Sequence, residues 1–262
     1  MFVWSFFQHL LFHPPSSFVR GAITTIYVAV IAQALGVGLG LVLALWRRSR
    51  RAPLRIFASG YIWLVRGTPL LVQAMLMYDG ISSIGLYKFP DQHVLGVLIP
   101  GVIQAGILTL ALNEGAYMAE IMRAAIDSVE TGQTEAAESL GMRRRQAMRH
   151  VVLPQAMRVV IPPLGNEFNN MLKVTSLLSV IGLQELFLAG QDYNSATFRT
   201  FEIFLVVAIY YIVMTTVWSF IQSAIERRLE ARGGSGIDRV TLRERLFGGG
   251  AIVAAEQLRG AR

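Results

Sequence analysis

The sequence predicts an all-α membrane protein that crosses the bilayer several times, and three observations support this fold class. Of its 262 residues, 53% are hydrophobic, above the roughly 45–50% typical of soluble domains. The apolar residues gather in runs of about 20, the length that a helix needs to span the hydrocarbon core. Arginines cluster directly beside these runs, as they do in cytoplasmic loops. We therefore expect a polytopic protein with five transmembrane helices.

The expected spans cover approximately residues 23–45, 56–78, 94–119, 162–181 and 203–225. Most arginines follow the first, third and fifth of these spans, so the positive-inside rule places the N-terminus outside and the C-terminus in the cytoplasm. The membrane domain is expected over residues 18–230. The glycine clusters in residues 231–262 are typical of a flexible cytoplasmic tail, with at most a short helix around residues 238–247.

Composition also limits the kinds of chemistry that the chain can perform. There is no cysteine and there are four scattered histidines, so we expect no disulfide framework, catalytic thiolate or metal site. We attribute the net charge of +7 to the membrane topology of the chain and to contact with lipid, because no nucleic-acid-binding motif accompanies it. Residues 1–17 are apolar and aromatic but lack the basic start and cleavage site of a signal peptide. We expect them to form an interfacial segment.

Glycines in the first span resemble a nucleotide-binding loop only superficially. No strand precedes Gly36-Val37-Gly38-Leu39-Gly40 and no lysine follows it, so phosphate binding is not expected. Small residues allow two helices in a membrane to approach closely. Gly36 and Gly40 are therefore predicted to form a small face that packs against another helix.

The second span is broken in the middle by Arg66-Gly67-Thr68-Pro69. Proline lacks a backbone donor and disfavours helix at the preceding residue, so a kink or a new helix start is expected here. Arg66 lies either at the membrane edge, as a snorkelling anchor, or deeper, where its cost implies a partner and a function. The sequence leaves both readings open.

Polar residues of the third span include a pathway candidate. Asn113, Tyr117 and Glu120 fall on one side of a helix. Glu120 fits either the pathway or the membrane interface, whereas Glu114, six residues deeper, is the better pathway candidate because carboxylates within spans normally face the bundle interior or a wet cavity.

The fourth span is interleaved with polar residues at helical spacing. Asn166, Asn170 and Lys173 align on one face, with Glu167 and Asn169 beside them. An interhelical hydrogen-bond seam is one interpretation. A solute-lining stripe is favoured because a cation and a carboxylate are both present, and Lys173 with Glu114 or Glu167 would complement an amino acid's carboxylate and ammonium.

The stretch of about 127–154 between the third and fourth spans is expected to lie in the cytoplasm. Thr134 is an N-cap candidate, Ala136 and Ala137 favour helix and offer a small surface, and Gly141 ends the helix. A second helical piece is expected over residues 142–152, ending before Pro154. This pattern indicates a docking element for another protein, the alternative being a membrane-surface helix held by Arg143-Arg144-Arg145 on anionic lipid.

These residues carry a resemblance to a known family. Glu135-Ala136-Ala137, Gly141 and Val151-x-Leu153-Pro154 match the E-A-A-x3-G-x9-I-x-L-P loop of permeases from binding-protein-dependent ATP-binding-cassette importers, with Val151 in place of isoleucine. Residues 18–230 resemble in particular the polar amino acid uptake subfamily. Further matches are Arg66-Gly67-Thr68-Pro69-Leu70-Leu71, Gly115-Ala116-Tyr117 with Glu120, Lys173-x-Thr175-Ser176-Leu177, Ile181-Gly182 and Glu185-Leu186.

The resemblance implies a permease subunit of the bacterial inner membrane. It would pair with an identical or similar permease, receive a polar amino acid from an extracytoplasmic binding protein, and use ATP and Mg bound by a cytoplasmic ATPase. This chain has no G-x-x-x-x-G-K-[ST] loop, so no cofactor and no enzymatic activity are expected in it. The residues expected to couple to the ATPase are Glu135, Ala136, Ala137, Gly141, Leu153 and Pro154. The residues expected along the substrate pathway are Arg66, Asn113, Glu114, Tyr117, Asn166, Glu167, Asn170 and Lys173.

Two other classes of function are weighed against this one. An ion-coupled amino acid carrier would use Glu114, Glu120, Glu167 and Lys173 as a relay, but the sequence shows no convincing inverted repeat. A membrane scaffold that transports nothing would leave the polar stripe of the fourth span unexplained.

Overall fold

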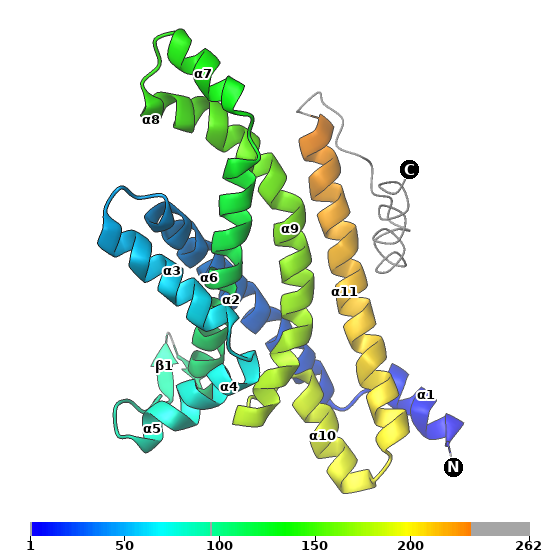
Figure 1. The fold of residues 1–262 in the computed structure, drawn as a ribbon. Coiled ribbons are helices and arrows are strands. Elements are labelled where there is room, and N and C mark those ends of the chain that lie inside the picture. Colours follow the sequence, from blue (N-terminus) through cyan, green and yellow to red (C-terminus); the bar gives the residue numbers. More distant parts are fainter. Residues whose placement is uncertain (1, 95, 232–262) are drawn as a thin grey trace, which may run out of the picture. The chain divides into compact units, whose positions relative to one another are not determined.

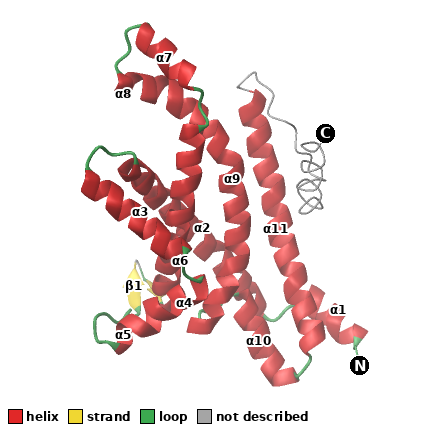
Figure 2. Ribbon diagram, viewed as in Figure 1, coloured by secondary structure: helices red, strands yellow, loops and turns green. Residues whose placement is uncertain are grey.

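The structure is a computed structural model that describes residues 2–94 and 96–231 (Figure 1). It divides into two units, Met1–Tyr211 and the part that begins at Ile212. Figure 2 shows that nearly all regular structure in the described part is helical, which confirms the predicted fold class.

The elements follow one another along the chain with short connections. The α-helices are α1 (Trp4–Phe12), α2 (Ser16–Arg47), α3 (Ala52–Arg66), α4 (Leu70–Met75), α5 (Ile81–Ser83), α6 (Gly101–Asp127), α7 (Thr131–Ser139), α8 (Arg144–Ala147), α9 (Leu153–Val174), α10 (Leu186–Thr197) and α11 (Thr200–Ala231). The other elements are the π-helical turns η1 (Leu76–Gly80) and η2 (Met148–Val152), the 3₁₀ segment η3 (Thr175–Ile181), and the strands β1 (Gln92–Val94) and β2 (Val97–Ile99).

Close packing of α2 against α6 forms the centre of the first unit. A Cβ added at Gly36 would lie 2.6 Å from Cβ of Glu114, and one at Gly40 would lie 2.5 Å from Cβ of Met118. Atoms cannot approach this closely, so both positions require glycine. The predicted small face is confirmed, and Gly38, whose added Cβ meets nothing within 4 Å, does not belong to it.

A second contact joins the later half of α6 to α9. Its buried residues are mostly small or flexible: Ala44, Met118, Met122, Ala125, Ile126, Val152, Ala156 and Val160. Small side chains here let α2, η2 and α9 converge on α6, which fixes the two helices that lead to and from the α7–α8 region.

Two described helices, α2 and residues Thr200–Leu229 of α11, are long and apolar enough to cross a membrane. A third span results if the segments Arg144–Ile181 and Leu186–Thr197, bent by 51°, are counted as one. The other expected spans fall short because α3 has 15 residues and because Gln104, Asn113 and Glu114 dilute the apolar character of α6.

The second and third expected spans differ from the structure at their ends. The break at Pro69 is confirmed, since α3 ends at Arg66 and α4 starts at Leu70. The third span was expected from residue 94, but the helix begins at Gly101 because the preceding strands β1 and β2 pair antiparallel, with Gln92 opposite Ile99. The helix then continues to Asp127, beyond the expected end.

The fourth span and the helix before it also differ from expectation. The piece expected to end before Pro154 instead continues through the π turn into α9, where Pro154 occupies the first turn. The π turn η2 ends at Val152, shortly before Pro154, and such turns occur where the regular hydrogen-bond ladder of a helix is interrupted. Pro162 and Pro163 lie inside α9 rather than at its start, and the last part of the expected span is the 3₁₀ segment η3.

The remainder of α11, Ile212–Ala231, belongs to the second unit. The hydroxyls of Thr215 and Ser219 donate to the carbonyls of Ile212 and Thr215 within this helix. Nearly all of the predicted tail, including the short helix expected at residues 238–247, lies outside the described residues.

Candidate functional site

The turn between α7 and α8 is built by a specific backbone arrangement. Gly141 has a φ of +83°, its N–H donates to the carbonyl of Glu138 at 2.9 Å, and the N–H of Met142 donates to the carbonyl of Ala137 at 3.1 Å. This pair of bonds is the Schellman motif, which satisfies the last carbonyls of a helix. The prediction that Gly141 ends the helix is therefore confirmed.

Other expectations for this region require correction. The helix begins at Thr131 rather than after Thr134, and its N-cap is Glu130 without a side-chain cap bond. The two alanines do not form one surface, because Ala137 is buried where α7 packs on α8 and η2 while Ala136 is exposed. Leu140 is 82% exposed at the tip and follows Ala136 by one helical turn.

The α7–α8 region projects beyond the ends of α6 and α9, at the opposite end of these helices from α10 (Figure 1). Arg143, Arg144 and Arg145 are exposed there, and Leu153 and Pro154 begin α9. The exposed surface that we name the coupling tip consists of Glu135, Ala136, Leu140 and Gly141.

The second part of the site is organised around the break between α3 and α4. The side-chain amide of Gln73 donates to the carbonyl of Val65 at 2.7 Å and to the hydroxyl of Thr68 at 2.8 Å. Its oxygen accepts a hydrogen bond from Asn113 at 3.0 Å. Gln73 therefore satisfies backbone groups freed by the break and fastens it to α6.

A cavity of about 500 Å³ opens beside this break. Residues from the break, from α6, from α9 and from η3 line it: Arg66, Gly67, Thr68, Pro69, Leu70, Leu110, Asn113, Glu114, Tyr117, Glu167, Asn170, Met171, Val174 and Leu177. This volume lies within the range of about 300–1,000 Å³ that is usual for small-molecule sites.

The three charged side chains of the cavity have different contacts. The guanidinium of Arg66 lies 5.2 Å from the ring centroid of Tyr117, a cation–π distance. Glu114 is 4% exposed and accepts a hydrogen bond of 2.9 Å from Gln33 of α2. Glu167 reaches the cavity from α9. One cation and two carboxylates thus share one space.

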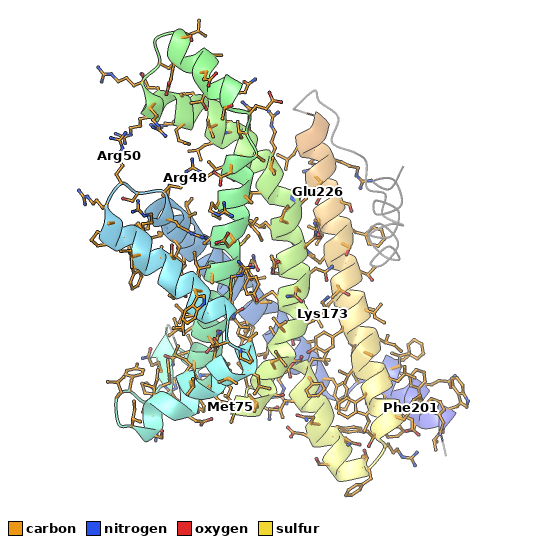
Figure 3. All side chains as sticks on the ribbon, in the orientation of Figure 1. Arg48, Arg50, Met75, Lys173, Phe201 and Glu226 are labelled. Carbon is orange, nitrogen blue, oxygen red and sulfur yellow. The ribbon has the colours of Figure 1, made fainter. Side chains whose placement is uncertain are left out.

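Six of the eight predicted pathway residues line this cavity, and two do not. Among the described residues of α9, Asn166 and Lys173 are exposed outside the cavity lining; Figure 3 labels Lys173. The stripe that faces the cavity is Glu167, Asn170, Met171 and Val174, so the predicted face was rotated by about one residue, or 100° of the helix. A contact between Lys173 and solute in this cavity is not supported.

Glu120, which the sequence left between pathway and interface, lies outside the cavity. Its carboxylate pairs with Arg47 at the end of α2 and with Arg123 at 3.0 Å. Arg48 and Arg123 both pair with Asp127. These ion pairs join the ends of α2 and α6 next to the α7–α8 region, which corresponds to the interface alternative.

Sequence reasoning missed three residues that the structure brings into the site: Gln33, Gln73 and Leu140. Gln33 is one of the few polar residues in the first expected span, and a buried amide in a membrane segment requires a partner. Gln73 follows the Pro69 break by four residues, so its side chain returns to the break, a spacing that the sequence does show. Leu140 is an apolar residue in a polar loop.

The fold and the site define a polytopic helical membrane protein with a polar cavity among its central helices, the architecture of a solute-transport component. The chain belongs to the family described as the inner membrane component of binding-protein-dependent transport systems, whose model matches residues 36–231. It is thus a pathway-forming, non-catalytic subunit of an ATP-binding-cassette importer. The comparisons give no support to the ion-coupled carrier.

The similarity to curated relatives extends over most of the chain. It is 40% identical over 205 residues to the probable amino-acid permease protein YxeN of Bacillus subtilis, covering 78% of this chain and 88% of the relative. It is 36% identical over 212 residues to the glutamine transport system permease protein GlnP of Escherichia coli, covering 81% and 92%.

Solved structures agree with this assignment. A crystal structure of an amino acid ABC transporter with histidines matches with a TM-score of 0.76 and 41% identity, covering 87% of this chain and all of the other. The MetNI methionine ABC transporter in an inward-facing conformation matches with a TM-score of 0.65 and 18% identity, covering 81% and 96%. The second match concerns the fold alone.

Proposed function

We propose that this permease carries a polar amino acid through the cavity between α3, α4, α6 and α9. The observation that carries the proposal is the placement of Arg66, Glu114 and Glu167 in one cavity. An amino acid has a carboxylate and an ammonium group, and its recognition in a membrane requires one partner of each charge. The names of the relatives, which include amino-acid and glutamine permeases, support this substrate class.

Within the cavity, Arg66 binds the carboxylate because its planar guanidinium donates in parallel to two oxygens. Stacking on Tyr117 limits its motion and leaves donors facing the cavity. Glu167 accepts from the ammonium group. Glu114, buried and bonded to Gln33, supplies negative charge on the cavity wall and holds α2 against α6.

The coupling tip docks in a groove on a cytoplasmic ATPase that binds ATP and Mg. Leu140 supports this docking because a large apolar side chain that is 82% exposed gains free energy when a partner covers it. The Schellman turn presents this side chain on a fixed backbone. We place the tip, Leu153, Pro154 and the C-terminus in the cytoplasm and the N-terminus outside, following the arginine distribution.

The full importer would contain a second permease, identical or similar to this one, and an extracytoplasmic solute-binding protein. Closure of the ATPase pair would shift the permease between inward- and outward-facing states, a population change that requires different contacts in the two states. The four exposed residues of the coupling tip would supply those contacts.

Uptake measured in proteoliposomes tests the proposal. The chain is purified with its native partners, and radiolabelled glutamine, arginine and histidine are offered with the binding protein outside and ATP inside. We expect uptake of at least one of these that requires ATP. Arg66→Gln should lower uptake about tenfold, since a hydrogen bond to a charged group contributes about 1.5–3 kcal/mol, and Arg66→Lys should retain more activity than Arg66→Gln.

Lys173→Met is the matched control because it also removes one positive charge but lies outside the cavity lining. Its uptake should stay close to that of the unaltered protein. Equal uptake by the Arg66→Gln variant would refute the cavity assignment. Uptake that stops when ion gradients are dissipated at constant ATP would refute ATP-driven import itself.

A further inference from the structure

Helix α1 precedes the region that the family model matches and is unusually aromatic. Five of the residues from Phe2 to Phe12 are phenylalanine or tryptophan. One side of the helix is internal, since Phe7 and Leu10 are buried. On the other side, Trp4 is 67% and Phe12 is 72% exposed. The protein therefore maintains large aromatic side chains where the first unit itself does not cover them.

Hydrogen bonds to α11 hold α1 in a fixed position. The N–H of Val3 donates to Glu202 at 3.0 Å, near the start of α11. The hydroxyl of Tyr210, about two turns further along α11, donates to the carbonyl of Leu11 at 2.9 Å. These bonds fasten both ends of α1 to the first turns of α11, so α1 is not a loose terminal segment.

Aromatic contacts extend the same surface onto α11. The ring of Phe2 packs edge-on to Trp4, at 4.9 Å between centroids, and to Phe201, at 5.7 Å. Phe201 is 69% exposed and is labelled in Figure 3. We name Trp4, Phe12 and Phe201 together the aromatic anchor.

The anchor lies beside the starts of two helices that are long and apolar enough to cross a membrane. Only residues 13–15 separate α1 from α2, and α2 is long and apolar enough to span. The exposed large apolar side chains of α2 begin at Val19, one turn after its start. Thr200, the residue next to Phe201, begins the second qualifying helix. Two spans therefore start beside the anchor.

We propose that the aromatic anchor binds the phospholipid interface, with Trp4, Phe12 and Phe201 inserted at the boundary between headgroups and acyl chains. Tryptophan and tyrosine concentrate at this depth in membrane proteins, and helices that lie in the interface bury an apolar side rich in tryptophan, phenylalanine and leucine about 5–10 Å into it. The proposal concerns lipid contact and does not depend on the transported solute.

Two basic side chains near the aromatic anchor are also consistent with a position at the membrane interface. Arg199 lies with its guanidinium 4.9 Å from the ring centroid of Phe6, and Arg20 donates back to Ser16 at the first turn of α2. Both cations stand at the starts of the spans, where long basic side chains reach toward headgroups. Ser5 and His9, also exposed on α1, lie beside this face on the more polar side of the helix, whereas Gln8 stands between Trp4 and Phe12 at helical spacing.

Fluorescence quenching in bilayer nanodiscs tests the proposal with the full-length chain. The protein has four tryptophans, so replacing Trp46, Trp63 and Trp218 with phenylalanine leaves Trp4 as the only emitter. Phosphatidylcholine brominated near the carboxyl end of its acyl chains should quench Trp4 about twofold, and lipid brominated near the chain terminus should quench it less, because the interface is shallow. Aqueous iodide should quench it only weakly.

Two further single-tryptophan variants serve as controls in the same background with Trp4→Phe. His9→Trp moves the emitter to the more polar side of α1 and should gain quenching by iodide. Leu140→Trp places it at the coupling tip, where iodide but not bromolipid should quench it. Strong iodide quenching of Trp4, equal to that at position 140, would refute the proposal by showing that the anchor faces water. Quenching by neither agent would also refute it, because a second copy or another protein would then cover the anchor.

Discussion

Gly141 is required for its conformation rather than for space. Its φ is +83°, and a Cβ added there would meet nothing within 4 Å. A side chain at this position therefore costs free energy only through the left-handed backbone, about 1–2 kcal/mol for an ordinary residue and more for a β-branched one. Asparagine is tolerated in this conformation better than other residues.

This difference gives a prediction with a built-in control. Gly141→Val should weaken binding of the ATPase about tenfold, because about 1.4 kcal/mol of distortion at the coupling tip corresponds to that factor. Gly141→Asn, which adds a side chain of similar size, should bind within about twofold of the unaltered protein. Binding is measured by titrating the ATPase onto the permease in nanodiscs. If both variants bind equally weakly, bulk at the tip and not backbone conformation is decisive.

At the scale of residues, the sequence identified the chemistry of the cavity better than its geometry. Arg66, Asn113, Glu114 and Tyr117 were predicted and line it, because charged and polar residues in apolar segments stand out without any structure. Lys173 lies outside this lining, and the sequence does not reveal how a helix is rotated about its axis. That rotation depends on packing with α6, which local spacing does not encode.

Glu185 shows how a single buried carboxylate can fix an element. It is fully buried and accepts from the N–H groups of Phe187 and Leu188, at 2.9 and 2.7 Å, at the start of α10. It also accepts from the hydroxyl of Tyr211 at 2.7 Å. Thr25 of α2 donates to Glu185 at 3.5 Å and accepts from the N–H of Leu186 at 3.3 Å. The carboxylate therefore joins α10 to α2 and to the first part of α11.

Replacing this carboxylate should destabilise the helical bundle. Glu185→Ala removes the N-cap of α10 and leaves buried donors without an acceptor, so we expect a loss of roughly 3 kcal/mol. Glu185→Gln retains one acceptor oxygen and should lose about half as much. Thermal unfolding of the purified permease, followed by circular dichroism, measures the difference. Unchanged unfolding of the alanine variant would contradict the structural role assigned to Glu185.

At the scale of elements, continuous patterns were predictable and local irregularities were not. The long apolar runs of α2 and α11 and the break at Pro69 follow from composition and from proline geometry. The π turns, the 3₁₀ segment and the paired strands β1 and β2 were missed. These irregular segments depend on tertiary contacts, such as the packing of η3 against α4 and α10, that do not appear in the periodicity of the chain.

In the first unit as a whole, the cavity and the coupling tip are joined by the same two helices. Glu114 lies on α6, and Asp127 ends this helix 13 residues later, about 20 Å along its axis. Chain continuity then leads through α7 and α8 into α9, which returns to the cavity with Glu167 and Asn170. A displacement of the coupling tip therefore reaches both walls of the cavity without passing through a flexible linker.

This arrangement predicts that nucleotide bound by the ATPase changes access to the cavity. The chain has no cysteine, so Asn170→Cys introduces the only thiol of this subunit, on the cavity wall. In proteoliposomes holding the importer, a membrane-impermeant maleimide should label this thiol from the cytoplasmic side without nucleotide. With ATP and vanadate the labelling rate should fall by about tenfold or more, as a shift between two states requires.

Leu140→Cys separates this change from a general effect of nucleotide on the protein. Its thiol at the coupling tip should be labelled in the isolated permease and protected in the assembled importer, because in the proposed docking the ATPase would cover it in both nucleotide states. Labelling of Asn170→Cys at the same rate with and without nucleotide would show that the cavity does not respond to the ATPase. The rigid connection through α6 and α9 would then be insufficient for coupling, and transmission would have to pass through the second permease.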